Sequence, residues 1–331
     1  MDMPQVHPSS RLQQAFTKLR EELQQSIIGQ PHLIDCLLVA LLADGHLLVE
    51  GAPGLAKTTA VKALAACIEA DFHRVQFTPD LLPADLTGTD IFRTQSGSFE
   101  FERGPLFHNI VLADEINRAP AKVQSALLEA MAERQITIGR STWRLPELFM
   151  VMATQNPIEQ EGTFALPEAQ LDRFVMHVTI GYPDAPSELA ILRLAREQAR
   201  RSLHPQPPAR ATLSQSDVFA AREAVLSVHM APALEAYLTQ LVLASRDAGA
   251  YGPELKRWIA WGASPRATIA LDRCARAHAW LAGRDYVLPE DIHAIAHDVL
   301  RHRVLLSYEA EAEGVRSDQV VSRLLDLVPL P

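Results

Sequence analysis

The sequence predicts an α/β protein with a parallel sheet flanked by helices, followed by an all-α region. Short apolar runs alternate with longer amphipathic segments in the first half of the chain, which is typical of a sheet covered by helices on both faces. Two runs, at residues 110–113 and 148–154, are continuously apolar, as in parallel strands that are buried on both sides. Beyond residue 186 the pattern is helical and β-branched runs are almost absent.

The expected elements follow in order from the N-terminus. Residues 11–25 form an amphipathic helix, because apolar side chains beginning with Leu12 and Phe16 recur at three- and four-residue steps. A break at residues 26–31 separates it from a second apolar helix that ends at Leu42. The elements expected next are a strand at residues 46–50, a helix at 58–69, and strands at 73–77, 110–113, 148–154 and 173–180.

The domain organisation follows from length and from one change of pattern. A chain of 331 residues suits two domains better than one core. The glycine- and proline-containing stretch at residues 181–186 marks the expected boundary. We therefore expect an N-terminal helix and linker at residues 1–30, an α/β core at 31–183 and a C-terminal helical domain at 184–331.

Composition and charge narrow the classes of function. With 48% hydrophobic and 21% charged residues, the chain is neither disordered nor dependent on disulfides. The net charge of −9 and the lack of a basic stripe argue against nucleic acid as a partner. No apolar run has the length of a membrane span, and residues 1–10 are polar, so we expect neither membrane insertion nor secretion. Three widely spaced cysteines without a C-x-x-C motif suggest idle thiols in the cytoplasm.

A phosphate-binding loop follows the first strand. Gly51-Ala-Pro-Gly-Leu-Ala-Lys57-Thr58 nearly matches the pattern G-x-x-x-x-G-K-[ST], in which backbone N–H groups at a helix N-terminus surround a phosphate. Lys57 supplies positive charge to the β- and γ-phosphates, and the Thr58 hydroxyl can ligate Mg²⁺. The alternative is an ordinary strand-to-helix turn. The nucleotide-binding candidates in this loop are Gly51, Ala52, Pro53, Gly54, Leu55, Ala56, Lys57, Thr58 and Thr59.

The loop departs from the general pattern at Ala56, where the pattern has glycine. Alanine suits this position if its backbone dihedrals are helical and its amide still points toward phosphate. These two conditions decide whether the loop can bind phosphate in the usual way.

A pair of carboxylates, Asp114 and Glu115, ends the apolar run at residues 110–113. An aspartate at this point can bind Mg²⁺ directly or through water, and the adjacent glutamate can polarise the water that attacks a γ-phosphate. The alternative is that these are two solvated carboxylates at a strand end. The phosphate loop upstream argues against this alternative.

Three further side chains are candidates for the same chemistry. Asn156 follows the strand at residues 148–154, where an uncharged amide can orient the lytic water, although Asn-Pro also starts turns. Arg173 can stabilise transition-state charge on a neighbouring subunit's nucleotide, or form a plain surface pair with its neighbour. Arg266 begins a helix, where its charge opposes the helix dipole. Contact with phosphate in the cleft between the domains would explain its position.

A histidine pair with metal-ligand spacing, His293 and His297, lies on an expected helix. No H-E-x-x-H pattern or nearby cysteine supports zinc binding there, and we expect this helix to serve packing.

With these residues assigned, the chain resembles the MoxR-type AAA+ ATPases, a helix-2-insert clade related to magnesium-chelatase motor subunits. The resemblance extends from Ile28 to Leu306, and this family also has alanine at the position of Ala56. The matching strings are Gly51-Ala-Pro-Gly-Leu-Ala-Lys-Thr58, Asp114-Glu-Ile-Asn-Arg-Ala-Pro120, Ala126-Leu-Leu-Glu-Ala-Met131, Ala153-Thr-Gln-Asn-Pro157, Leu166-Pro-Glu-Ala-Gln-Leu-Asp-Arg-Phe174, Gly262-Ala-Ser-Pro-Arg-Ala267 and Val299-Leu-Arg-His-Arg303.

The resemblance implies a P-loop NTPase core with a helical lid, ATP and Mg²⁺ as ligands, and assembly into a homo-oligomeric ring, commonly a hexamer. It also implies a chaperone-like activity on a client protein, with partners that contain von Willebrand factor A domains. Lys57 and Thr58 then belong to Walker A, Asp114 and Glu115 to Walker B, Asn156 to sensor 1, Arg173 to the arginine finger and Arg266 to sensor 2. Other arginines that could be the finger are Arg118, Arg134 and Arg140.

Three more segments fit the family. Ile28 resembles the residue that covers adenine, although a plain turn between helices explains it equally well. Residues 97–103 resemble the helix-2 insert, and residues 135–145 resemble the hairpin before sensor 1. Such hairpins face the pore in related rings, whereas ordinary edge hairpins are the alternative.

We therefore expect Mg²⁺-dependent ATP hydrolysis in a ring that remodels or activates a partner protein. Three alternatives stay open: a nucleotide-gated scaffold without useful turnover, a motor subunit of a magnesium- or cobalt-chelatase-like complex, and a DNA helicase of the same clade. The acidic charge balance argues against the helicase.

Overall fold

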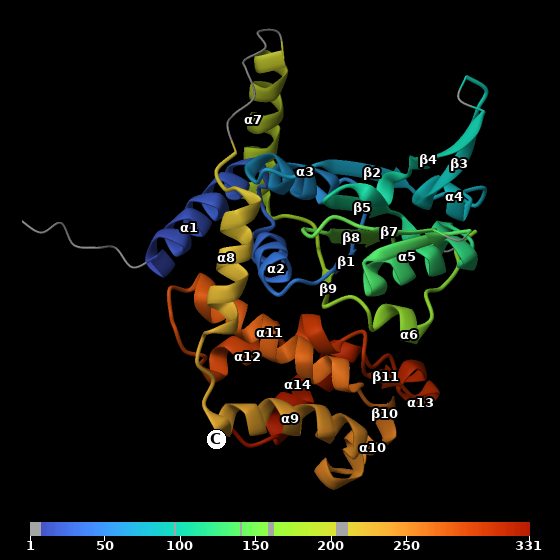
Figure 1. Cartoon of the computed structure of the whole chain (residues 1–331). Coiled ribbons are helices and arrows are strands. Elements are labelled where there is room, and N and C mark those ends of the chain that lie inside the picture. Colours follow the sequence, from blue (N-terminus) through green and yellow to red (C-terminus); the bar gives the residue numbers. More distant parts are fainter. Residues whose placement is uncertain (1–7, 96, 140, 158–161, 203–210) are drawn as a thin grey trace, which may run out of the picture.

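The computed structural model describes residues 8–95, 97–139, 141–157, 162–202 and 211–331 (Figure 1). Among these residues, no helix combines the length and the apolar character that crossing a bilayer requires.

The centre of the molecule is a five-stranded sheet in the order β2-β5-β8-β1-β9, and all its strand pairs are parallel. The α/β fold class is therefore confirmed. Each strand expected from the sequence is present, and β5 and β8 are buried along nearly their whole length. The strands are β1 (Leu47–Glu50), β2 (Phe72–Gln76), β5 (Ile110–Asp114), β8 (Met150–Gln155) and β9 (Met176–Thr179).

Helices cover both faces of this sheet, because its strands alternate their apolar side chains between two separate cores. Leu47 and Val49 pack in the core formed with α1 (Pro8–Ser26), α2 (Pro31–Leu42) and α3 (Lys57–Cys67). Leu48 packs on the other side, with α5 (Ala121–Glu133). Short helices lie at α4 (Pro83–Thr87) and α6 (Glu168–Leu171), and 3₁₀ turns at Pro105–Phe107 and Ile116–Arg118.

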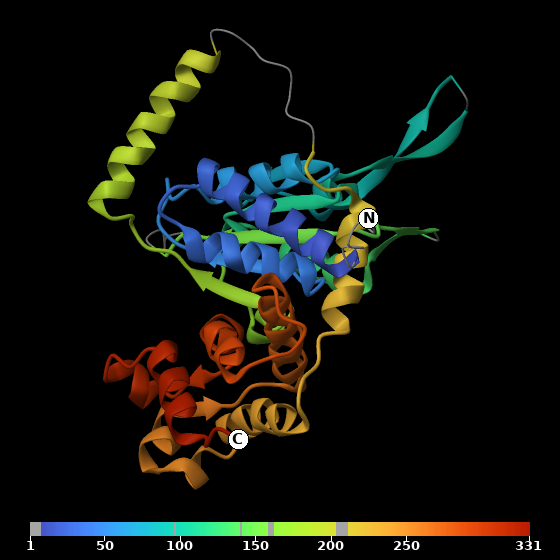
Figure 2. The ribbon, with the colours of Figure 1, turned by 90° about the vertical axis from the view of Figure 1, so that its left-hand side faces the viewer.

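Two antiparallel hairpins extend from the core. The hairpin of β6 (Gln135–Ile138) and β7 (Ser141–Arg144) lies where the sequence predicted it. The strand expected at residues 97–103 is β4 (Ser98–Arg103), and it pairs with β3 (Gly88–Arg93), which sequence analysis did not identify. In Figure 2 this teal β3–β4 hairpin projects from the body of the molecule. Whether either hairpin lines a pore stays a prediction.

The rest of the chain is helical, as expected, with one addition. Strands β10 (Ile259–Trp261) and β11 (Leu305–Leu306) form a small antiparallel pair, so this region is not purely α-helical. Strands of three and two residues are too short to leave a period-two pattern in a sequence. The helices are α7 (Ala185–Ser202), α8 (Gln215–Leu226), α9 (Pro232–Arg246), α10 (Pro253–Trp258), α11 (Pro265–Leu281), α12 (Pro289–Leu300), α13 (Tyr308–Ala312) and α14 (Ser317–Leu327), with a 3₁₀ turn at Ala248–Tyr251.

The helices after residue 184 do not form a single body. Helix α7 extends away from the sheet, whereas α9 to α14 lie together on the opposite side of the molecule (Figures 1 and 2). Helix α8 packs against α1, α2 and α11, and so bridges the two regions. The division at residues 183 and 184 remains a prediction.

One buried side chain joins the lid helices to the sheet. Arg303 follows α12 and is almost completely buried, and it donates to the Asp172 carboxylate at 2.8 Å. It also donates to the carbonyl oxygens of Phe174 (2.6 Å) and Val175 (3.1 Å), just before β9. These bonds hold the end of α12 against the amino-terminal end of β9.

Candidate nucleotide site

The phosphate-binding loop connects the carboxyl end of β1 to the first turn of α3, as its mechanism requires. A Cβ added to Gly51 would lie 2.4 Å from the Ile180 side chain, so only glycine fits there. Gly54 has φ +83°, a left-handed conformation that glycine adopts without strain. The two glycines therefore shape the loop for different reasons.

Ala56 is left-handed, with φ 59° and ψ 17°, so it does not have the right-handed helical dihedrals that would suit an alanine there. The right-handed turn of α3 begins only at Lys57, and a left-handed residue redirects the chain into it. The position therefore keeps the conformation that glycine would favour, although an alanine occupies it. This conformation costs an alanine about 1–2 kcal/mol.

Lys57 is the first residue of α3, and its side chain turns back toward the loop. Its Nζ donates to the Gly51 carbonyl oxygen at 2.5 Å. Burial lowers the pKa of the Lys57 amine, while the charges of Asp114, Glu115 and Glu50 oppose that shift. A bound phosphate would add a further negative charge that stabilises this half-buried ammonium group.

The two carboxylates are held by different partners at the end of β5. Asp114 Oδ1 accepts the Thr154 hydroxyl at 2.6 Å, and its Oδ2 accepts from Arg74 at 2.7 and 3.0 Å. Glu115 is left-handed (φ 58°), and its backbone N–H donates to Thr154 Oγ1 at 2.9 Å. Thr154 therefore fixes both residues relative to β8.

The Glu115 carboxylate has two polar neighbours of its own. Its Oε2 accepts from Gln76 Nε2 at 2.7 Å and from Arg118 at 3.1 Å. Sequence analysis missed Arg74, Gln76 and Thr154. They reach the carboxylates because β2 and β8 flank β5, and this strand order is not visible in a single sequence.

The predicted phosphate-site residues meet in one cavity of about 330 Å³. Its walls contain the positive charges of Lys57 and Arg74 beside the carboxylates of Asp114 and Glu115. The oxygen donors of Thr58 and Asp114 are ligands of the kind that Mg²⁺ prefers, so the residues present fit a magnesium nucleotide. The cavity is lined by Pro53, Gly54, Leu55, Ala56, Lys57, Thr58, Thr59, Arg74, Asp114, Glu115 and Asn156.

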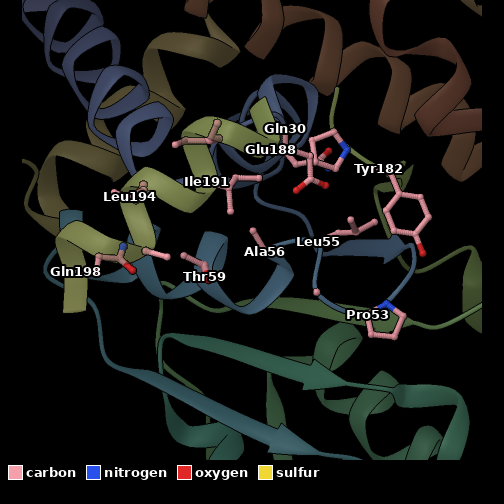
Figure 3. A pocket seen from close by; sticks show the side chains of 15 residues that line it. Gln30, Pro53, Leu55, Ala56, Thr59, Tyr182, Glu188, Ile191, Leu194 and Gln198 are labelled. Atoms are coloured by element: carbon pink, nitrogen blue, oxygen red, sulfur yellow. The ribbon is translucent and has the colours of Figure 1, made fainter. Parts of the chain in front are cut away.

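A second cavity, of about 340 Å³, lies on the other side of the same loop (Figure 3). Ile28 lines it, as the resemblance suggested, together with the apolar side chains of Ile191 and Leu194 from α7. Gln30 lies on its wall and donates to the Gly181 carbonyl oxygen at 2.8 Å. Because both cavities share residues 53–56 and Thr59, they can hold the base and the phosphates of one nucleotide.

Arg173 and Arg266 lie elsewhere. Arg173 lies shortly before β9, which begins opposite Leu47, whereas the phosphate loop follows Glu50 at the far end of β1. Three residues of strand separate these two ends, about 10 Å. Arg266 lines the same surface cavity as Arg173, and its side chain is 53% exposed. Arg266 therefore lies away from the phosphate loop of its own chain, and its contact with a nucleotide phosphate stays a prediction.

Asp172 explains the position of Arg266. Its carboxylate accepts the Ser264 hydroxyl at 2.8 Å and lies 3.8 Å from the Arg266 guanidinium. These contacts hold the start of α11 at the amino-terminal edge of the sheet, because Asp172 precedes β9.

The alternative finger arginines occupy different places. Arg118 pairs with Glu115 of its own chain, and Arg134 pairs with Asp44 at 2.7 Å. Arg140 lies outside the described residues. Of the candidate finger arginines in the described part of the chain, Arg173 lies beside Arg266, on a face away from the phosphate loop.

Comparison with known proteins shows which family this chain belongs to. The family described as "ATPase family associated with various cellular activities (AAA)" matches residues 46–176, and an AAA lid domain matches residues 256–324. The chaperone MoxR1 of Mycobacterium tuberculosis is 45% identical over 94% of this chain and 81% of its own length. The MoxR protein of Paracoccus denitrificans is 34% identical over 96% of both chains. A solved structure of a candidate ATPase from Cytophaga hutchinsonii is 46% identical, with a TM-score of 0.90 over 98% of this chain and 97% of that one.

Similarity to the chelatase motors is more distant. A magnesium-chelatase subunit of Nicotiana tabacum is 28% identical over 59% of this chain and 42% of its own length.

Proposed function

Because this chain belongs to the MoxR family of AAA+ ATPases, we propose that it binds ATP with Mg²⁺ and hydrolyses it in a ring of identical subunits. The single observation that best supports hydrolysis is the convergence of Lys57, Glu115 and Asn156 on one cavity beside the phosphate loop. A positive charge, a general base and a neutral amide are the groups that phosphoryl transfer to water requires.

The residues that line the two cavities have separate roles in this proposal. Ile28 and the apolar residues of α7 hold the base, and the loop amides with Lys57 hold the phosphates. Thr58 and Asp114 would hold Mg²⁺, which neutralises phosphate charge when it is bound. Glu115 takes the proton of the attacking water, and Asn156 orients that water.

The two arginines support assembly into a ring. Arg173 and Arg266 lie at the opposite edge of the sheet from the phosphate loop of their own chain. In a head-to-tail ring, one edge of each subunit faces the other edge of its neighbour. We propose that Arg173 and Arg266 stabilise the phosphates bound by the adjacent subunit, in a ring that is commonly a hexamer in this family.

The names of similar proteins suggest what the energy of ATP hydrolysis is used for. One of them is named a chaperone, and our proposal is that this chain remodels or activates a client protein in the cytoplasm. A protein with a von Willebrand factor A domain is the partner that the family resemblance suggests. Affinity purification with a Glu115→Gln chain tests this, since the hydrolysis-deficient form should retain partners that wild type releases.

The Glu115→Gln substitution also tests hydrolysis directly. Glutamine preserves the size of the side chain and cannot accept the proton of water, so we expect ATP binding to persist while phosphate release falls at least 100-fold. Glu133→Gln is the matched control, because Glu133 is exposed at the end of α5. Undiminished hydrolysis in Glu115→Gln would exclude the base role. Wild-type binding without turnover would instead favour the scaffold alternative.

A further inference from the structure

Three potential metal ligands meet between the core and the lid, and none of them lines either nucleotide cavity. His32 and Cys36 are four residues apart and lie on one face of α2, and Asp298 reaches them from α12. Their ligand atoms all lie within 4.8 Å of one another. Among the described residues, no other three His, Cys, Asp or Glu donors form such a group.

The distances fit a tetrahedral metal. His32 Nε2 lies 3.0 Å from Asp298 Oδ2 and 3.5 Å from Cys36 Sγ, and Sγ lies 3.8 Å from Oδ2. In tetrahedral zinc sites with bonds of about 2.0–2.3 Å, neighbouring ligand atoms are roughly 3.3–3.6 Å apart. An ion placed just outside the plane of these three atoms can therefore reach all of them with small side-chain shifts.

The surroundings orient one ligand and leave an entry path. Arg301 donates to Asp298 Oδ1 at 2.8 Å, which leaves Oδ2 directed at His32 and Cys36. Such hydrogen bonds to a ligating carboxylate are typical of metal sites. The Asp298 side chain is 2% exposed, whereas the His32 side chain is 54% exposed, so an ion can enter from solvent at His32.

The histidine pair noted in the sequence offers a contrast. His293 Nε2 is bound to the Tyr237 hydroxyl at 2.8 Å, and His297 Nε2 is bound to the Ser322 hydroxyl at 2.9 Å. Each of these rings has its own partner, and the two do not converge with a third donor. The pair that meets a third donor is His32 and Cys36. Sequence analysis missed it because that donor, Asp298, is 262 residues from Cys36.

We propose that His32, Cys36 and Asp298 bind a divalent metal of the zinc class, with water as the fourth ligand. Imidazole, thiolate and carboxylate together favour Zn²⁺ over Mg²⁺ or Ca²⁺. The bound ion fastens α12 of the lid to α2 of the core. Binding displaces the thiol proton of Cys36 to solvent.

The competing account is a hydrogen-bonded cluster without metal, in which Asp298 accepts from both His32 and Cys36. Metal binding must release the thiol proton of Cys36, because the thiolate is the form that ligates a metal. Metal affinity should therefore increase with pH.

The test uses the full chain, stripped with chelator and titrated with Co²⁺ and Zn²⁺ without nucleotide. We expect one equivalent to bind, and the Co²⁺ form to show a thiolate charge-transfer band that Zn²⁺ removes. His32→Gln and Cys36→Ser should each weaken binding at least tenfold, and Cys36→Ser should abolish the band. The matched controls are His297→Gln and Cys67→Ser, which should bind like wild type.

A thermal melt gives a second readout. Zn²⁺ should raise the Tm of wild type and of His297→Gln, but not of His32→Gln. The His32 side chain is 54% exposed, so its replacement leaves the packing of the core intact. The proposal is overturned if wild type shows no thiolate band and no stoichiometric binding, or if His32→Gln and Cys36→Ser bind with unchanged affinity. Neither readout depends on ATP hydrolysis, so the metal site can be tested independently of the proposed function.

Discussion

At the scale of single residues, two residues with a left-handed backbone conformation shape the candidate nucleotide site. Ala56 (φ 59°) ends the phosphate loop, and Glu115 (φ 58°) turns the chain at the end of β5. Non-glycine residues adopt this conformation only at a cost, so the surrounding structure must hold them in it. Sequence reasoning identified both residues by chemical type and missed both conformations, because a backbone dihedral is set by the neighbours in space.

Replacing Ala56 with glycine should stabilise the protein. Glycine removes the cost of a left-handed alanine, and the gain is about 0.5–1 kcal/mol after the extra freedom of the unfolded chain is counted. The urea midpoint should rise while nucleotide binding persists. The matched control is Ala63→Gly within α3, which should destabilise by about 1 kcal/mol. Equal destabilisation by both substitutions would contradict the role assigned to Ala56.

The buried side chain of His46 makes stability depend on pH. Burial lowers the pKa of His46 to about 4. Its ring accepts the Val151 N–H at 3.0 Å and donates to the Met131 carbonyl oxygen at 3.3 Å, an arrangement that needs the neutral form. The unfolded chain takes up this proton near pH 6.5, whereas the folded chain does so only near pH 4. The free energy of unfolding should therefore fall as the pH drops from 6.5 toward 4, by about 2 kcal/mol at pH 5 from this residue.

Urea unfolding at pH 5 and pH 7.5 measures that effect. His302 is also buried with a lowered pKa and contributes in the same direction, so the comparison must be made against a variant. In His46→Gln, the loss of stability between the two pH values should be smaller than in wild type by about 2 kcal/mol. An identical loss in both proteins would show that His46 is not the group that titrates.

At the scale of elements, the strands were predictable and their neighbours were not. Continuous apolar runs predicted β5 and β8 within one or two residues of their ends. The order β2-β5-β8-β1-β9 depends on contacts between distant segments, and that order is what brings Arg74 and Thr154 to Asp114. The site residues that were missed are therefore those contributed by adjacent strands.

The connection between α12 and β9 predicts a large loss of stability on mutation. Arg303→Met leaves the Asp172 carboxylate without its buried cation and removes the bonds to the Phe174 and Val175 carbonyl oxygens. Breaking a buried pair in this way costs about 3–5 kcal/mol, which urea unfolding would measure. The control is Arg323→Met, which breaks a half-exposed pair with Glu254 and should cost less than about 1 kcal/mol. Similar costs for the two changes would show that Arg303 does not join the lid to the core.

At the scale of the whole molecule, the polarity of the parallel sheet separates the two halves of the proposed catalytic apparatus. The phosphate loop, Asp114 and Asn156 lie at the carboxyl ends of β1, β5 and β8, as in other open α/β sheets. Arg173 and Arg266 lie at the amino edge. The residues of all these groups could be picked out from sequence, but not the edge on which each would lie. Under the proposed mechanism, a complete site would combine the carboxyl edge of one subunit with the amino edge of its neighbour.

Complementation between two inactive chains tests this account most directly. Lys57→Ala removes the phosphate-binding charge, and Arg266→Ala removes an exposed arginine from the opposite edge, so each chain alone should lose most ATP hydrolysis. When the two are mixed equally, roughly a quarter of the subunit interfaces combine an intact Lys57 with an intact Arg266. The account predicts that phosphate release recovers to a comparable fraction of the wild-type rate. Mixed rings that form but show no more activity than the separate variants would contradict it.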